Sequence, residues 1–201
     1  MGKNLSAKEC DACGNLIYYG GNCNCMVDAY KEPSDEEIRA WVKETDEVLR
    51  PQAEQYILNK YNDMKQRNEV QNIWNAFEFH SAIWYSSVEI LPNLEVQVVI
   101  DSEDSCFVTT GSAGYVEFGM QPPIGMKLPI KCWIHTHPFG SAYFSGTDIS
   151  TVSIWDTTMQ NAIVLGGYNH WGSWVQERPK ELMIYRNGRE ERLQKWGDEE
   201  E

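Results

Sequence analysis

The segment of residues 134–148, I-H-T-H-P-F-G-S-A-Y-F-S-G-T-D, restricts the fold of this 201-residue chain more than any other part of it. His135 and His137 follow an apolar run, and side chains two residues apart on a strand share one face. Pro138 cannot continue the hydrogen bonding of a strand, so the strand should end there with both imidazoles at its rim. Asp148 then lies in the first turn of a predicted helix. The segment therefore predicts a strand, a loop and a helix.

Two histidines and a carboxylate at this spacing favour a metal site. If the loop folds back, Asp148 becomes a third ligand beside His135 and His137. This donor set is typical of catalytic zinc, which keeps its fourth position open to water. Either half of the pattern alone has a structural explanation, because His-x-His occurs by chance and Ser145-x-x-Asp148 is also a helix capping box. Together they favour the metal site.

The rest of the chain combines helical and strand patterns. Helical spacing of apolar residues covers 34–49, 51–64 and 70–77. Strand patterns are expected at 82–84, 96–100, 106–109, 115–118, 128–135 and 163–165, and a hairpin at 182–186 and from 189 onward around Asn187-Gly188. This order predicts an α+β or mixed α/β fold.

The charge of the chain limits its partners. Thirty Asp and Glu outnumber seventeen Lys and Arg, which gives a net charge of −13 and disfavours nucleic acid. No apolar stretch is long enough for a membrane helix, and the first residues lack the apolar run of a secretory signal. We therefore expect a soluble, cytoplasmic protein with neither a membrane nor a nucleic acid as partner.

Four cysteines near the start predict a second metal site. The pattern C-x-x-C-G, followed by C-x-C, suits a small zinc ribbon within residues 1–31, with a helical linker or extension at 32–70; the four residues are Cys10, Cys13, Cys23 and Cys25. An iron site or disulfides are the alternatives, and the lack of a signal peptide disfavours disulfides. Cys106 and Cys132 stand alone and should pack as small apolar residues in strands.

The metal-site segment resembles the motif of the JAMM (MPN-plus) metalloproteases in His135, His137, Ser145 and Asp148. The resemblance extends over roughly residues 70–195 and implies a metalloprotease domain at 71–197, with a cytidine-deaminase-like sheet and flanking helices. It further implies that the two histidines and Asp148 bind one catalytic zinc ion. Ser145 would then donate a hydrogen bond to the oxyanion of the tetrahedral intermediate.

The resemblance also implies a glutamate, just after a helix and at the start of a strand, that acts as general base and acid. We assign this role to Glu78, which follows a helical pattern and precedes the apolar residues 82–84. Glu89 and Glu95 are the competitors. His80 is two residues from Glu78 and could share its face, but we interpret it as a partly buried, hydrogen-bonded side chain.

The function expected from these features is hydrolysis of an amide or isopeptide bond at the C-terminal tail of a ubiquitin-like protein or its conjugates. Two alternatives stay open. The chain is either a non-catalytic MPN-like scaffold, or a JAMM peptidase that acts on a sulfur-carrier, phage-tail or cell-wall substrate. Inactive members of that fold usually lose the metal ligands, and this chain has them.

Overall fold

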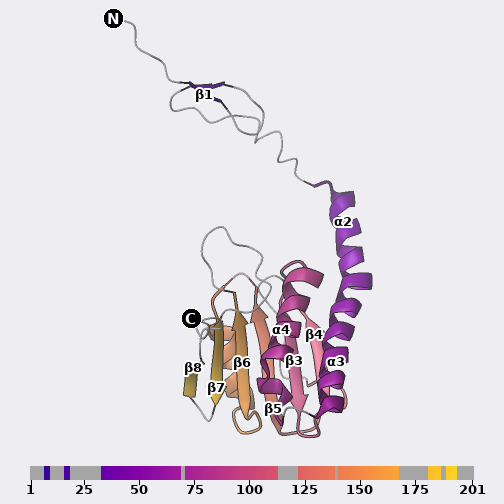
Figure 1. Cartoon of the computed structure of the whole chain (residues 1–201), viewed down its shortest axis with the longest axis vertical. Coiled ribbons are helices and arrows are strands. Elements are labelled where there is room, and N and C mark those ends of the chain that lie inside the picture. Colours follow the sequence, from indigo (N-terminus) through magenta and orange to yellow (C-terminus); the bar gives the residue numbers. More distant parts are fainter. Residues whose placement is uncertain are drawn as a thin grey trace, which may run out of the picture. The chain divides into compact units, whose positions relative to one another are not determined.

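The structure is a computed structural model that describes residues 7–9, 16–18, 33–68, 71–112, 122–138, 140–167, 181–186 and 189–193 (Figure 1). The chain divides into two compact units, Met1–Lys43 and Glu44–Glu201. Each unit is described by itself below.

The first unit contains a small hairpin and a helix. Strands β1 (Ala7–Glu9) and β2 (Leu16–Tyr18) pair antiparallel, and α2 (Asp35–Glu44) follows. Ser34 caps α2 as the sequence predicts: its backbone N–H and its hydroxyl both donate to Oε2 of Glu37, at 2.7 Å each. The four cysteines of the predicted zinc ribbon, Cys10, Cys13, Cys23 and Cys25, lie outside the described residues.

The second unit is built on a mixed six-stranded sheet with the strand order β4-β3-β5-β6-β7-β8. Its strands are β3 (Val96–Asp101), β4 (Cys106–Thr110), β5 (Ile130–His137), β6 (Asn161–Gly166), β7 (Glu181–Arg186) and β8 (Arg189–Leu193). β5 and β6 pair parallel and α5 (Gly146–Trp155) connects them, whereas the other neighbouring strands of this sheet pair antiparallel. The architecture confirms the α+β prediction.

Helices α3 (Arg50–Arg67) and α4 (Phe77–Tyr85) cover one face of this sheet (Figure 1). Their inward side chains form one core with the strand residues on that face, among them Val98, Ile134 and Leu165; α3 contributes Ala53, Ile57, Tyr61 and Met64, and α4 contributes Phe79, Ile83 and Trp84. Three short helical segments border them: the π-helices η1 (Thr45–Leu49) and η3 (Ser86–Ile90), and the 3-10 helix η2 (Ile73–Asn75). The structure thus places α3, which the sequence assigned to a linker or extension, in the core of the unit that carries the sheet.

Helix α5 covers the opposite face. Val152 and Trp155 of α5 pack against Trp133, Val99 and Val164 of the sheet in a second buried cluster. Since neighbouring residues of a strand point to opposite faces, Ile134 belongs to the first core while Trp133 belongs to the second. The sheet therefore lies between the core that includes α4 and the cluster that includes α5.

The strand expected at 82–84 is wrong, because these residues lie inside helix α4. An apolar run this short does not distinguish a strand from a buried helix. The helical pattern at 70–77 gives only the short turn η2 before α4 begins. The β7–β8 pairing confirms the predicted hairpin, while the strand expected at 115–118 falls outside the described residues. In the described part of the chain no helix has the length and apolar character to cross a membrane.

Candidate metal centre

The end of β5 and the start of α5 bring the predicted ligands together. His135 and His137 close strand β5, and their side chains share the face that α5 covers. Ser145 is the N-cap of α5: its Oγ accepts from the backbone N–H of Asp148 at 3.3 Å. In return Oδ2 of Asp148 accepts the backbone N–H of Ser145 at 2.6 Å. This capping box holds the carboxylate at the rim of the sheet.

The carboxylate of Asp148 lies between the two imidazoles. Its Oδ1 is 3.2 Å from Nε2 of His135, and its Oδ2 is 3.6 Å from Nε2 of His137. One ligand atom from each residue lies within 4.8 Å of the others. Two atoms bound at 2.0–2.2 Å to a tetrahedral ion are about 3.4 Å apart, so each of these two distances between histidine and carboxylate is close to the spacing of zinc ligands. The sequence prediction that these three residues converge is confirmed.

The hydrogen bonding of His135 also fits a metal ligand. Its side chain is 1% exposed, and neither ring nitrogen has a hydrogen-bond partner among the residues that the structure describes. The short distance to Asp148 does not have hydrogen-bond geometry. A buried polar atom without a partner costs about 1–3 kcal/mol, and a bound cation would satisfy the lone pair of Nε2. These residues can hold a metal ion.

The protonation states are those that metal binding needs. Burial lowers the pKa of His135, although the nearby carboxylate of Asp148 opposes the shift. Burial alone would raise the pKa of Asp148, but contacts with His135, His137 and Ser145 outweigh it and hold that pKa well below its usual range. A neutral imidazole and an ionised carboxylate are the ligand forms that bind cations.

A glycine at the end of β6 allows the ligand loop to cross the sheet. Gly166 pairs with His137, and the loop between β5 and α5 passes directly over it. A Cβ atom at Gly166 would lie 2.1 Å from the backbone N of Ala142 and 2.5 Å from the carbonyl carbon of Ser141. Only glycine permits this approach. The sequence contains this glycine as Gly166-Gly167, but the need for glycine at this position becomes visible only when the loop at Ser141 and Ala142 is placed next to it.

Aromatic side chains enclose the histidines. The indole of Trp133 stacks on His135 with ring centroids 4.4 Å apart and an interplanar angle of 18°. Tyr143 meets His137 edge-on at 5.0 Å, and Phe144 meets His135 at 6.4 Å. Tyr143 is 53% exposed, so it lies at the mouth of the site. The packing fixes the ring orientations and lowers the local dielectric constant.

Glu78, predicted as the general base, is not brought to this site. It lies in the first turn of α4, on the face of the sheet opposite the histidines. Its Oε1 accepts hydrogen bonds from Lys60 Nζ at 2.7 Å and from Arg67 Nη2 at 2.8 Å, both on α3. These bonds lower the pKa of Glu78, and the hydrogen bond with Lys60 has the largest effect, although the side chain is exposed. Glu78 therefore links two helices.

The strand register places Glu95 beside the histidines instead. Gln97 of β3 pairs with His135 of β5 in antiparallel register. The backbone N–H of Val96 donates to Oγ1 of Thr136, which is consistent with the same register. Continued by one more residue, this register sets Glu95 opposite His137. Trp133 Nε1 donates to Oε1 of Gln97 at 3.1 Å, which fixes the side chain of Gln97 on the face of Trp133 and His135.

The alternation of β3, continued by one residue, assigns Glu95 to that face. This residue exchanges two hydrogen bonds with the β4 side of the sheet, from Glu95 N to Ser112 O and from Gly111 N to Glu95 O, at 2.8 Å each. Its side chain is 7% exposed. Glu95 directly precedes β3 and follows the helical segment, which is the context that the family resemblance implies for the general base.

The other candidates have structural roles. Glu89 is exposed in η3. His80 is buried, as predicted, and its Nε2 lies 2.8 Å from the carbonyl oxygen of Trp74; burial lowers its pKa to about 4. Cys132 packs in the core on the side of the sheet that α3 and α4 cover, away from His135. Burial raises the pKa of the Cys106 thiol to about 12. Both cysteines thus behave as the apolar residues that the sequence predicts.

Comparison with protein-family models, with curated proteins and with solved structures finds no match to this chain in any of the three.

Proposed function

We propose that the chain is a zinc-dependent hydrolase of amide or isopeptide bonds, with the MPN-type fold and JAMM-type site that its motif resembles. The observation that carries the proposal is the convergence of His135, His137 and Asp148 on one point, with both ring nitrogens of His135 buried and lacking hydrogen-bond partners among the described residues. Two imidazoles and one carboxylate are the donor set of hydrolytic zinc sites.

Three residues would hold the ion. Because Oδ2 of Asp148 already accepts the backbone N–H of Ser145, Oδ1 is the carboxylate oxygen with more capacity for a cation. Bound zinc supplies Lewis-acid chemistry there, since it polarises an amide carbonyl and makes water acidic enough to attack at neutral pH. Trp133, stacked on His135, keeps bulk water from one side of the ligands.

Glu95 is the residue that we assign to proton transfer, in place of Glu78. The strand register, which sets Glu95 opposite His137, supports this assignment, because the carboxylate would then lie on the face where the substrate must bind. There it would take a proton from the attacking water and deliver it to the leaving amine. Glu78 cannot serve, because the sheet stands between it and the ligands and two cations hold its carboxylate.

Ser145 suits the stabilisation of the oxyanion. Its Oγ accepts the backbone N–H of Asp148, which leaves the hydroxyl hydrogen to donate. A hydrogen bond from this hydroxyl to the oxygen of the tetrahedral carbon would be stronger in the transition state than in the substrate, as catalysis requires.

An extended tail fits the geometry around the site. Among the described residues, β4 is the edge strand of the sheet and pairs with β3, which Glu95 directly precedes. A peptide in extended conformation can add to such an edge by backbone hydrogen bonds. The C-terminal tail of a ubiquitin-like protein has this form, and we propose such a protein or its conjugates, in the cytoplasm, as substrate. Sulfur-carrier, phage-tail and cell-wall substrates remain alternatives.

The test is a panel of ubiquitin-like proteins joined through their C-terminal carboxyl group to a lysine side chain or to a fluorescent amine. We expect the zinc-loaded chain to cleave at least one of them, a chelator to stop cleavage, and zinc to restore it. Asp148→Asn should lose both activity and one zinc equivalent. A chain that holds zinc at these three residues but cleaves no member of the panel would favour the scaffold alternative.

A further inference from the structure

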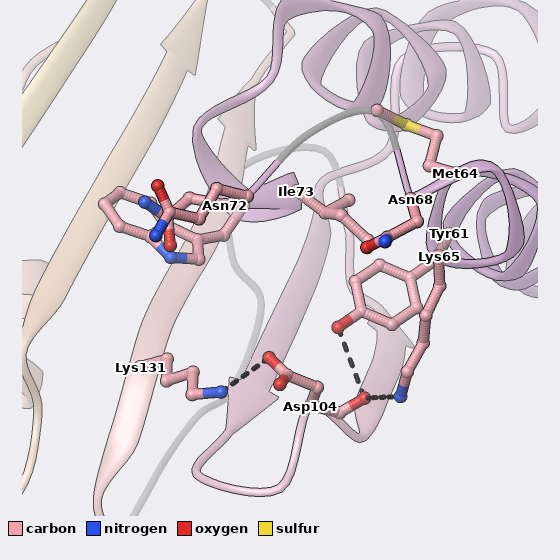
Figure 2. Close-up of a pocket in the computed structure, with 10 residues that line it drawn as sticks. Tyr61, Met64, Lys65, Asn68, Asn72, Ile73, Asp104 and Lys131 are labelled. Carbon is pink, nitrogen blue, oxygen red and sulfur yellow. Dashed lines mark hydrogen bonds and ion pairs between the residues drawn. The ribbon is translucent and has the colours of Figure 1, made fainter.

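A second pocket lies away from the metal centre, on the side of the sheet that α3 and α4 cover. It has a volume of about 250 Å³, and its walls come from the end of α3, the segment before α4, the β3–β4 turn and the first residues of β5 (Figure 2). It shares Tyr61 and Met64 with the helical core, whereas His135 faces α5. Its chemistry is therefore independent of the proposed hydrolysis.

Asp104 organises one wall of this pocket (Figure 2). The residue has a positive φ of 59° at the β3–β4 turn. Its backbone carbonyl accepts hydrogen bonds from the hydroxyl of Tyr61 at 3.2 Å and from Nζ of Lys65 at 2.9 Å. Its carboxylate pairs with Nζ of Lys131 at 2.6 Å. One turn thus brings two ammonium groups, from α3 and from β5, to the same wall.

The charge of this wall contrasts with that of the whole chain. The lining contains two lysines and one aspartate, in a chain of net charge −13. The contacts with Asp104 engage one N–H of each ammonium group, and an ammonium group has three donors. The ion pair with Lys131 already compensates the carboxylate of Asp104. The wall therefore attracts an anion.

The remaining walls suit a flat body. Trp74, Ile73 and Met64 supply aromatic and apolar surface, and Asn68 and Asn72 supply carboxamides that both donate and accept hydrogen bonds. An indole ring packs well against a planar group. Small-molecule sites typically combine such apolar walls with a few polar groups that fix the orientation of the ligand.

We propose that this pocket binds a small organic anion whose carboxylate or phosphate head contacts Lys65 and Lys131 and whose flat body packs against Trp74. Both kinds of head satisfy the two ammonium groups, and the probes below distinguish them.

The experiment is a nuclear magnetic resonance titration of the full-length chain with four probes. Adenosine 5′-monophosphate carries a phosphate on a flat body, and indole-3-acetate carries a carboxylate on one. Adenosine is a flat body without the head, and inorganic phosphate is a head without the body. We expect at least one of the two flat anions to bind with a sub-millimolar Kd and to shift the indole signal of Trp74. Adenosine and inorganic phosphate should bind at least tenfold more weakly.

Each titration is made with the zinc-loaded chain and again after removal of the metal, because phosphate and carboxylate also bind zinc. The proposed site requires the same Kd in both states. If no flat anion binds in this pocket, the proposed hydrolysis is not affected. If the chain does not bind zinc at His135, His137 and Asp148, the proposed anion site is not affected.

Matched variants locate the binding. Lys65→Gln and Lys131→Gln should each weaken the binding of the flat anion at least tenfold. Lys60→Gln, on the same helix but paired with Glu78 outside the pocket, should not change it. Lys65→Gln keeps the test decisive if Lys131→Gln does not fold. The proposal is wrong if neither flat anion binds with a Kd below 1 mM, if adenosine binds as tightly as its monophosphate and indole-3-acetate fails to bind, or if Lys65→Gln has no more effect than Lys60→Gln.

Discussion

Replacing Gly166 by alanine should disrupt the metal centre although Gly166 is not a ligand. The new Cβ would lie 2.1 Å from the backbone N of Ala142, 2.5 Å from the carbonyl carbon of Ser141 and 2.8 Å from Cα of Ala142. All three are backbone atoms, so no side-chain rotation relieves the contact. To reach an ordinary separation of about 3.4 Å, the loop must move by about 1.3 Å.

A movement of that size exceeds what zinc ligands tolerate, since bond lengths in zinc sites vary by about 0.2 Å. The loop leads directly into Ser145 and Asp148, and Gly166 pairs with His137. We expect zinc affinity to fall about 10- to 100-fold, which is the range typical when residues that orient the metal ligands are replaced. The rate of hydrolysis should fall by about 100-fold or more.

Zinc affinity is measured by competition with a chromophoric chelator, and folding by circular dichroism and thermal melting. Gly146→Ala is the matched control, because nothing lies within 4 Å of a Cβ at that position in the first turn of α5. It should bind zinc as the unmodified chain does. The reasoning is refuted if Gly166→Ala folds and binds zinc with unchanged affinity, or if both variants lose zinc equally.

Three further predictions follow from individual side chains. Glu95→Gln should keep its zinc and lower kcat by about 10²- to 10⁴-fold in the amide-cleavage assay, whereas Glu78→Gln should leave kcat unchanged; the reverse result would return the general base to Glu78. Ser145→Ala removes the cap of α5 and should cost about 1 kcal/mol in urea unfolding, in addition to a loss of kcat; unchanged stability would contradict the capping role. His80 stays neutral in the folded chain because burial lowers its pKa from 6.5 to about 4, while the unfolded chain takes up the proton near 6.5. Its contribution to stability is therefore complete above pH 6.5 and is lost as the pH falls toward 4, by about 3 kcal/mol at about 1.4 kcal/mol per pH unit. Urea unfolding of the metal-free chain at pH 7 and pH 4.5 should show a larger loss than the same measurement on His80→Gln, and equal losses would refute the assignment.

The metal ligands could be predicted because their spacing is local. His135 and His137 share a face wherever the strand lies in the fold, and Pro138 ends that strand. The loop from there to Asp148 is short enough that a capping box at the start of the helix returns the carboxylate to the histidines.

The place of Glu95, which we propose as the general base, could not be predicted in the same way, because it depends on strand register. Glu95 stands opposite His137 only through the pairing of β3 with β5, about forty residues apart in the sequence. Residues 82–84 are apolar enough to suggest a strand after Glu78, but they lie in α4, which packs against α3. That one error of element type moved the prediction to the opposite face of the sheet.

The second pocket had no sequence signal at all. Lys65 and Lys131 come together only because the β3–β4 turn places Asp104 between them. Neither lysine belongs to a motif, and each alone resembles an ordinary surface residue.

The proposed zinc ion between His135, His137 and Asp148 can be located by X-ray diffraction. The crystals would contain the zinc-loaded 201-residue chain, with data recorded on both sides of the zinc absorption edge. We predict an anomalous peak between the three side chains, about 2.0–2.2 Å from Nε2 of each histidine and from a carboxylate oxygen of Asp148. Crystals grown with saturating zinc that show no peak there, and a carboxylate hydrogen-bonded to a protonated histidine instead, would contradict the account.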